Sequence, residues 1–230
     1  MRFHELYERE TRPDQNEYIE KVKTFWSLWK KARRECSDFL KIYKRGPGVG
    51  LLYRGVKVGL PPAYKASSKP RPPEPGERRE EVDAWFREHG FDAQRHNSIF
   101  VANTYDQAMT YVRDHDGVAG SMALILPCNG FRYTWYRNAC DLYQLNFNTT
   151  LSKPDLNIDE LMAVAQPDNT GIEDFLGTYR HHELHFVGNY WSFEENVYGH
   201  LITCELHGQG LQNQKRWGRI PPDIAEYIGL

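Results

Sequence analysis

The residues of this chain that are best suited to chemistry lie in one short stretch, HHELH, at residues 181–185. The stretch differs from the zinc-protease helix H-E-x-x-H, because His182 and His185 are three residues apart rather than four. The apolar and aromatic residues that follow favour a strand, in which His181, Glu183 and His185 share one face. Two chemistries stay open: a metal site built from His181, His185 and a remote carboxylate, and a Glu183 carboxylate facing a cleft. A surface Glu between solvated histidines is the non-functional alternative.

A second candidate is Arg54, which ends the apolar run LLYRG at residues 51–55. Burying a guanidinium alone costs too much free energy, so its charge must reach a partner or water. Gly55 follows it directly, and a glycine lets a ligand approach the backbone closely. An arginine on an edge strand that pairs with a surface carboxylate is the alternative interpretation.

The third candidate is the stretch NSIFVANTYDQAMTYV at residues 97–112, which predicts a buried strand that turns directly into a helix. Asn103 or Thr104 can cap that helix, because each side chain offers an oxygen to the free amides of the first turn. Phe100 in the strand and Tyr111 in the helix are expected near each other at one end of a cleft.

The elements that must position these residues form an α+β pattern, with a helix first and then mostly strands. A helical stripe runs from Asn16 to about Tyr43, either as one helix or as two that break near residues 36–38. Asn129-Gly130 predicts a hairpin turn between strands at 120–128 and 131–137. The other predicted elements are an extended loop at 60–79, helices at 80–89, 157–166 and 172–176, strands at 141–145, 181–191 and 196–206, and a last helical turn within 217–230.

The charges of the 230 residues are unevenly placed: the first 95 hold 21 Lys and Arg against 15 Asp and Glu, and the rest hold 8 against 16. A basic first part suits an anionic partner such as a nucleotide or nucleic acid, and equally suits a basic helix beside an acidic body. The four cysteines form no C-x-x-C, which indicates free thiols in a reducing compartment. No signal peptide, membrane span, P-loop, G-x-S-x-G or dinucleotide fingerprint is visible, so we expect a soluble, cytoplasmic protein without a membrane partner.

Three pieces occur in an order that resembles the ADP-ribosyltransferase superfamily, in its arginine–serine–glutamate type: LYRG at 52–55, SIFVA with Ala108 and Tyr111 after it, and the late strand with Glu183. LLYRG, KPRPP, HGFDAQRHNSIFVA, FRYTWYRNACDLY and HHELHFVGNYW are also similar to phage and prophage proteins with an ADP-ribosyltransferase-like core. The resemblance covers roughly residues 36–206. It implies an ADP-ribosyltransferase-like split β-sandwich at 48–230, preceded by a helical N-terminal extension at 1–47.

The resemblance also implies how NAD, as substrate, would be held. Arg54 would bind the diphosphate or a ribose, since a guanidinium suits bidentate anion binding. Tyr53 and Gly55 would contact the cofactor, and the Gly55 backbone would clamp the nicotinamide amide. Phe100 and Tyr111 would stack on or enclose the nicotinamide ring.

Catalytic roles follow from the same resemblance. Glu183 would accept a hydrogen bond from the ribose 2′-OH and stabilise the oxocarbenium-like state as nicotinamide leaves. Ser98 would brace the cleft and orient Glu183. His181 stands where arginine-modifying toxins carry a second acidic residue, and it would serve as the base for the acceptor.

The implied function is an enzyme that transfers ADP-ribose to a macromolecule, with nucleic acid ahead of protein and no metal. A role as a toxin or phage–host conflict effector, with an antitoxin or inhibitor as partner, fits such enzymes. The first alternative is a non-enzymatic binding or structural phage protein that keeps the fold. The second is a metal-dependent hydrolase at His181 and His185.

Overall fold

The computed structural model describes residues 15–45, 51–57, 60–71, 79–113, 120–139, 157–177 and 182–206. The chain divides into two compact units, Met1–Lys31 with Val197–Leu230 and Ala32–Asn196. The β-sheet and both cavities discussed below belong to the second unit. The N-terminal residues within the described ranges are helical, as expected, whereas the proposed division into 1–47 and 48–230 stays a prediction.

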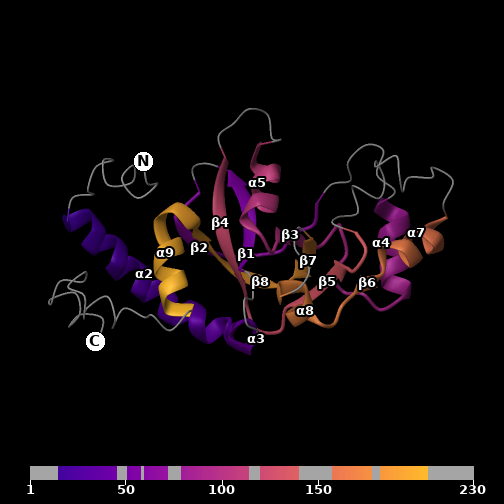
Figure 1. Ribbon diagram of the computed structural model, residues 1–230, viewed down its shortest axis with the longest axis horizontal. Coiled ribbons are helices and arrows are strands. Elements are labelled where there is room, and N and C mark those ends of the chain that lie inside the picture. The colour runs from indigo at the N-terminus through magenta and orange to yellow at the C-terminus, as the bar shows by residue number, and fades with distance from the viewer. Residues whose placement is uncertain are drawn as a thin grey trace, which may run out of the picture. The chain divides into compact units, whose positions relative to one another are not determined.

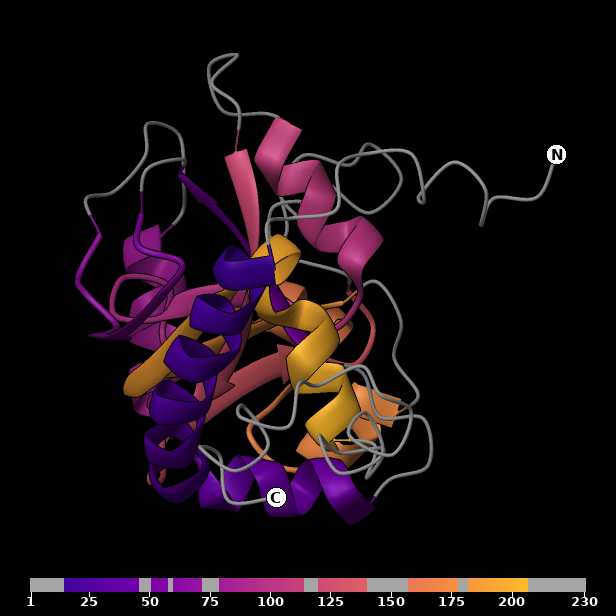
Figure 2. The ribbon, with the colours of Figure 1, turned by 90° about the vertical axis from the view of Figure 1, so that its left-hand side faces the viewer.

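The first unit contains most of helix α2 (Gln15–Glu35) and of helix α9 (Glu195–Leu206). The two helices run alongside each other there, as Figures 1 and 2 show in indigo and yellow. Phe25 and Trp29 of α2 recur four residues apart and are buried. Phe25 stacks on Tyr198 of α9 with ring centroids 5.8 Å apart, and the Trp29 indole donates to Glu205 Oε2 at 3.3 Å. The predicted apolar stripe of α2 is therefore the face that meets α9.

The strand predicted at 196–206 is wrong, because these residues form α9. Its buried side chains Tyr198, Leu201, Ile202 and Leu206 are spaced by three, one and four residues, which is a helical face. Aromatic and β-branched residues in this stretch favour a strand locally, and packing against α2 overrides that preference.

The second unit is built on one eight-stranded antiparallel sheet with the order β2-β8-β4-β1-β3-β7-β5-β6. Together with the helices it confirms the mixed α+β class. The strands are β1 (Leu52–Lys57), β2 (Ala63–Ser67), β3 (Ile99–Ala102), β4 (Gly120–Pro127), β5 (Arg132–Tyr136), β6 (Pro167–Asp168), β7 (Glu183–Val187) and β8 (Asn189–Glu194).

Helices pack on this sheet where the sequence predicts them, and the N-terminal helix breaks at residue 36 into α2 and α3. They are α3 (Ser37–Arg45), α4 (Arg79–Glu88), α5 (Tyr105–Arg113), α7 (Ile158–Ala165) and α8 (Ile172–Gly177). Helix α5 lies against β1 and β4, and α4 packs beside α7 over the buried Tyr136 of β5 (Figures 1 and 2). No helix in the described ranges is both long and apolar enough to cross a bilayer.

The hairpin predicted between 120–128 and 131–137 is wrong, although both strands exist. β4 pairs with β1 and β8, whereas β5 pairs with β7 and β6. Asn129 instead ties the turn to the start of α3, since its Oδ1 accepts from the Asp38 amide at 3.0 Å and its own amide donates to the Glu35 carbonyl at 2.6 Å. Gly130 turns the chain with φ 77°, and the next strand joins the other side of the sheet.

Two further predictions need correction. The stretch 60–79, expected to be an extended loop, contains β2, which pairs with β8. The single strand expected at 181–191 is two strands, β7 and β8, which Gly188 separates with φ 139°. The expected strand at 141–145 and the last helical turn within 217–230 lie outside the described residues.

The sheet is continuous but weakly joined at its centre. β1 pairs with β4 over six residue pairs, whereas β1 and β3 share only the pair Tyr53 and Ala102. No other residue pair joins β1 to β3 in the described part of the chain. We call β2, β8, β4 and β1 the β1 half, and β3, β7, β5 and β6 the β3 half.

Candidate functional site

A cavity of about 130 Å³ is lined mainly by residues of β1 and β3, and we call it the β1–β3 cavity. Its volume is roughly that of one six-membered ring. Five residues that the sequence singled out line it together with Arg71, Val101 and Ala102: Tyr53, Arg54, Gly55, Phe100 and Glu183. The structure therefore brings together residues that lie up to 130 positions apart in the sequence (Tyr53 to Glu183).

Arg54 supplies the cation of this cavity. Its Nη1 is buried and has no hydrogen-bond partner among the described residues. A buried donor that lacks an acceptor loses about 1–3 kcal/mol, and a charged donor loses more. An anionic or carbonyl group that entered the cavity would accept from Nη1 and recover this free energy. Arg54 is therefore suited to bind a ligand in the cavity.

Glu183 supplies the anion and is only 4% exposed. The fully buried His185 approaches it, with its Nε2 3.3 Å from Glu183 Oε2 and its Nδ1 3.5 Å from the Tyr136 hydroxyl. Burial lowers the pKa of His185, although Glu183 alone would raise it, so the imidazole is neutral. The hydrogen-bond network then assigns the tautomer: Tyr136 donates to Nδ1, and the Nε2–H donates to Glu183. The neutral imidazole thus holds the Glu183 carboxylate in place through this hydrogen bond.

Phe100 lines the same cavity as Arg54 and Glu183. Its ring stacks on the His185 imidazole with centroids 4.2 Å apart, and the Arg71 guanidinium carbon lies 4.0 Å from the Phe100 centroid. Arg95 is also near, at 5.3 Å. A planar ligand that stacked on Phe100 would have to share the ring with Arg71 or displace it.

Ser98 does not reach Glu183, which corrects the orienting role expected for it. The residue opposite Glu183 in the ladder is Ala102, four positions further along the strand, or about 13 Å at the usual rise per residue. The buried Ser98 hydroxyl instead donates to the Gln94 carbonyl. His185 is the side chain that orients Glu183.

Gly55 has a packing reason to be glycine. A Cβ atom at this position would lie 2.6 Å from Cγ2 of Val112 on α5, closer than real Cβ atoms come to other atoms. Tyr53 also contacts α5, where it lies edge-on to Tyr105 at 5.9 Å. The clamp on the nicotinamide amide expected of the Gly55 backbone stays a prediction.

Two predicted site residues cannot be placed in this way. Tyr111 belongs to α5, but its side chain lies outside what the structure describes, and so does the whole of His181. Among the described residues, no group of three or more His, Cys, Asp or Glu is arranged to hold a metal ion. The acceptor role of His181 and the hydrolase alternative therefore stay predictions.

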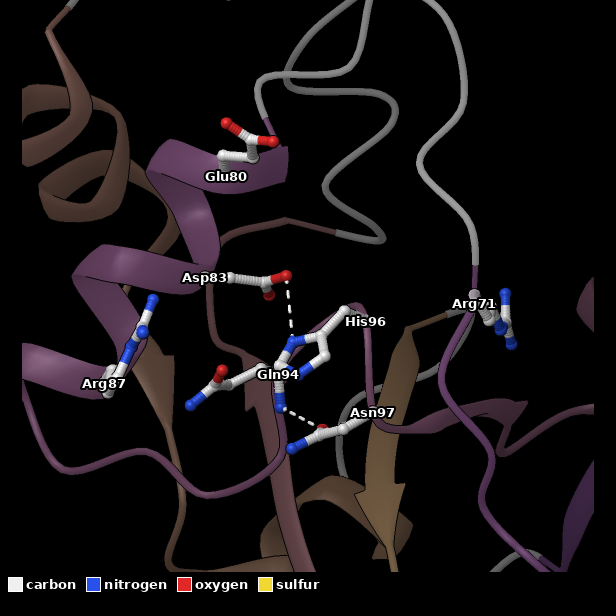
Figure 3. Close-up of a pocket in the computed structure, with 7 residues that line it drawn as sticks. All are labelled: Arg71, Glu80, Asp83, Arg87, Gln94, His96 and Asn97. Carbon is white, nitrogen blue, oxygen red and sulfur yellow. Dashed lines mark hydrogen bonds and ion pairs between the residues drawn. The ribbon is translucent and has the colours of Figure 1, made fainter.

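A second, larger cavity of about 690 Å³ lies beside α4, and we call it the α4 cavity (Figure 3). Residues from α4, from the turn before β3 and from the end of the β2 segment line it: Arg71, Glu80, Asp83, Arg87, Gln94, His96 and Asn97. Asp83 is buried there, and its carboxylate accepts from the Arg95 amide at 2.8 Å and from His96 Nδ1 at 3.1 Å. Arg71 lines both cavities.

No family model, curated protein or solved structure matches this chain. A functional proposal therefore depends on the resemblance of a few short motifs and on the geometry of the two cavities.

Sequence reasoning missed three of the residues that this geometry makes prominent, Arg71, Asp83 and His96, and it named His185 only as a possible metal ligand. The strand alternation already placed His185 on the face of Glu183, so its orienting role had a signal in the sequence. Arg71, Asp83 and His96 had none, because loop and helix segments bring them together without a periodic pattern.

Proposed function

We propose that this protein is an NAD-dependent ADP-ribosyltransferase that breaks the bond between nicotinamide and ribose and passes ADP-ribose to a macromolecule. The observation that carries the proposal is the β1–β3 cavity, where the unpartnered Nη1 of Arg54 and the buried Glu183 carboxylate line one ring-sized space. Buried polar groups are normally satisfied within the fold, so such a pair favours a bound ligand with an anionic part and a part that becomes cationic.

Glu183 would provide the electrostatic part of the catalysis. Positive charge develops on the ribose ring as the C1′–N bond breaks, and a fixed carboxylate beside it lowers the barrier. The neutral His185 at 3.3 Å keeps the carboxylate oriented. In a cavity that excludes water, this interaction is stronger than it would be in bulk solvent.

Arg54 would provide the binding part. The cavity holds about one ring, so the nicotinamide would occupy it and the rest of NAD would extend outward past Arg54. Phosphate or ribose oxygens would then satisfy Nη1. The proposal assigns the sheet to the split β-sandwich of these enzymes, and the single pair that joins β1 to β3 supports this assignment.

The direct test measures nicotinamide release and NAD binding by the wild-type protein and by Arg54→Lys. Lysine keeps the charge but loses the forked donors, so we expect NAD binding to weaken by about tenfold or more. Arg132→Lys is the matched control, because Arg132 is an exposed β5 residue that pairs with Asp92 at 3.6 Å. A wild-type protein that neither binds NAD nor releases nicotinamide contradicts the proposal.

The acceptor is tested by incubating the active protein with labelled NAD and separate pools of RNA, DNA and protein. We place nucleic acid ahead of protein because of the basic first part of the chain. Label retained by the RNA or DNA pool supports this order, and label retained by protein alone reverses it.

A non-enzymatic binding protein is the second candidate. Two positions of the resemblance, Ser98 and Gly55, have structural explanations that need no substrate, in a hydrogen bond to Gln94 and in packing against Val112. This candidate predicts that NAD or another nucleotide binds without any release of nicotinamide, which the same measurements detect.

A further inference from the structure

Two buried cysteines that the proposed function does not use lie side by side in the second unit. Cys36 is fully buried at the break between α2 and α3, and Cys128 follows directly after β4 and is 7% exposed. Both thiols are free, and their sulfur atoms are 3.8 Å apart, which is direct contact. A disulfide bond between them would require the two sulfurs to approach each other by about 1.8 Å.

The backbone on either side of the pair is held in place. The Asn129 amide donates to the Glu35 carbonyl at 2.6 Å, so a backbone hydrogen bond joins the immediate neighbours of the two cysteines. The Asn129 side chain adds a second connection, because its Oδ1 accepts from the Asp38 amide at 3.0 Å. The Cys128 amide donates to the Asn189 carbonyl of β8 at 2.8 Å. Backbones joined in this way lie within the separation that a disulfide spans, so the bond calls for side-chain movement rather than refolding.

The surroundings of the two thiols differ. Burial raises the pKa of both, which makes each a slow nucleophile in the resting protein. Two neighbours oppose this rise at Cys128, because the Cys36 thiol as a hydrogen-bond donor and the Lys65 ammonium each lower the Cys128 pKa. The Glu35 carboxylate raises the pKa of Cys36 further. Cys128 also has the exposed surface of the pair, so an oxidant reaches it first.

We propose that Cys36 and Cys128 form a reversible redox site, in which a hydroperoxide converts the thiol pair into a disulfide bond between the α2–α3 break and the end of β4. With hydrogen peroxide, the Cys128 sulfur attacks one oxygen and breaks the O–O bond, which gives Cys128 sulfenic acid and water. The Cys36 sulfur then attacks the sulfenic sulfur and displaces a second water. The two thiols lose two electrons and two protons, and the peroxide takes up both. A dithiol reductant reverses the change by thiol–disulfide exchange.

The short distance between the sulfurs favours the disulfide over further oxidation, because the sulfenic acid has a thiol beside it before a second peroxide arrives. The bond would link residues that are 92 positions apart. Closing so long a loop restricts the unfolded chain and thereby stabilises the fold. It would also fasten the start of α3 to the β1 half. This inference does not depend on the proposed function.

The test treats the full-length protein with hydrogen peroxide, stops the reaction with catalase and maps the cysteines by mass spectrometry of a non-reducing digest. We expect two peptides joined through Cys36 and Cys128, which dithiothreitol separates. The midpoint of thermal unfolding should rise by about 5–10 °C on oxidation and return on reduction. Free thiols at both positions after an excess of peroxide, or a bond to Cys140 or Cys204 in place of this pair, overturns the inference.

Two variants separate the roles of the thiols. Cys36→Ala leaves Cys128 without its partner, so Cys128 sulfenic acid should accumulate and react with dimedone. Cys128→Ala should give no dimedone adduct at Cys36, and neither variant should show the rise in unfolding midpoint. Cys140→Ala is the matched control, because it keeps the pair and should keep both the disulfide and the rise. An adduct at Cys36 in Cys128→Ala, with none at Cys128 in Cys36→Ala, contradicts the proposed order. The mapping of the wild-type protein decides the inference even where a variant fails to fold.

Discussion

The two halves of the sheet differ in what they bury. The β3 half and the segments that flank its strands bury seven polar side chains within the described residues: Gln94, Arg95, Ser98, Asn103, Thr134, Glu183 and His185. The strands of the β1 half bury one, Ser192. Burying polar groups opposes folding unless each is paired or used, so their concentration on one side marks where chemistry is held in place. The β1 half is the scaffold that presents Arg54 to it.

The β1 half has close apolar packing where the β3 half has buried polar side chains. Six consecutive residues of β4, Met122–Pro127 in the chain, are buried. Val112 of α5 approaches both neighbouring strands so closely that a Cβ at Gly55 or Gly120 would lie 2.6 Å or 2.4 Å from its methyl groups. The two halves therefore predict different responses to substitution, loss of activity on one side and loss of stability on the other.

The largest contrast should come from His185→Phe in the β3 half against Ser192→Ala in the β1 half. Phenylalanine keeps the stacking on Phe100 but removes the hydrogen bond to Glu183, and a hydrogen bond to a charged group is worth about 1.5–3 kcal/mol. We expect nicotinamide release to slow roughly 10- to 100-fold in His185→Phe. Ser192→Ala should stay within about twofold of wild type. Equal rates in both variants would remove the distinction between the halves.

A somewhat smaller effect, on stability, should come from Gly55→Ala. Overpacking against Val112 should lower the free energy of unfolding by about 1–3 kcal/mol in denaturant titrations. Adding Val112→Ala should recover part of that loss, so that the two substitutions are not additive. Gly177→Ala is the control, because nothing lies within 4 Å of a Cβ built there. A Gly55→Ala protein as stable as this control would show that α5 shifts to make room for the methyl group at little cost in free energy.

The smallest effects should appear as pH dependence of stability, with opposite signs for His185 of the β3 half and for Cys36, whose thiol bonds to β4 of the β1 half. Burial lowers the pKa of His185 below its ordinary 6.5, so the unfolded chain binds more protons and stability falls as the pH drops below about 6.5. Burial raises the pKa of the Cys36 thiol, which donates to the Leu126 carbonyl in β4, above its ordinary 9.0. The unfolded chain then loses protons first, and stability falls as the pH rises above about 9.

Thermal unfolding across pH checks both signs. His185→Phe should flatten the acid side of the profile, and Cys36→Ala should flatten the alkaline side. Profiles that keep both slopes in these variants would assign the pH dependence to other groups.

Local pattern was enough to predict much of the framework. Hydrophobic spacing and capping residues located β1, β3 with α5, α4, α7 and α8, because those signals lie within single elements. Asn129-Gly130 shows where such reasoning stops. The turn exists, but the partners of β4 and β5 are chosen by contacts with β1, β8, β7 and β6, which no local pattern encodes.

The candidate site could likewise be predicted from the sequence only in part. The order of Arg54, Phe100 and Glu183 predicted their convergence, and the structure places all three on one cavity. The role expected of Ser98 depended on register, which sets Ala102 rather than Ser98 opposite Glu183. The Asp83 and His96 pair depended on how α4 meets a turn, and a single sequence does not carry that information.

The measurement that tests the central claim most directly compares Glu183→Gln with wild type in nicotinamide release and in NAD binding by calorimetry. Glutamine keeps the shape and can still accept from His185, but it lacks the charge that stabilises the oxocarbenium-like state. We expect release to fall about 100- to 1000-fold or more while NAD binding stays near wild type. Glu194→Gln is the control, because this β8 carboxylate accepts from Ser121 and lines neither cavity. Release by Glu183→Gln at the wild-type rate would contradict the account.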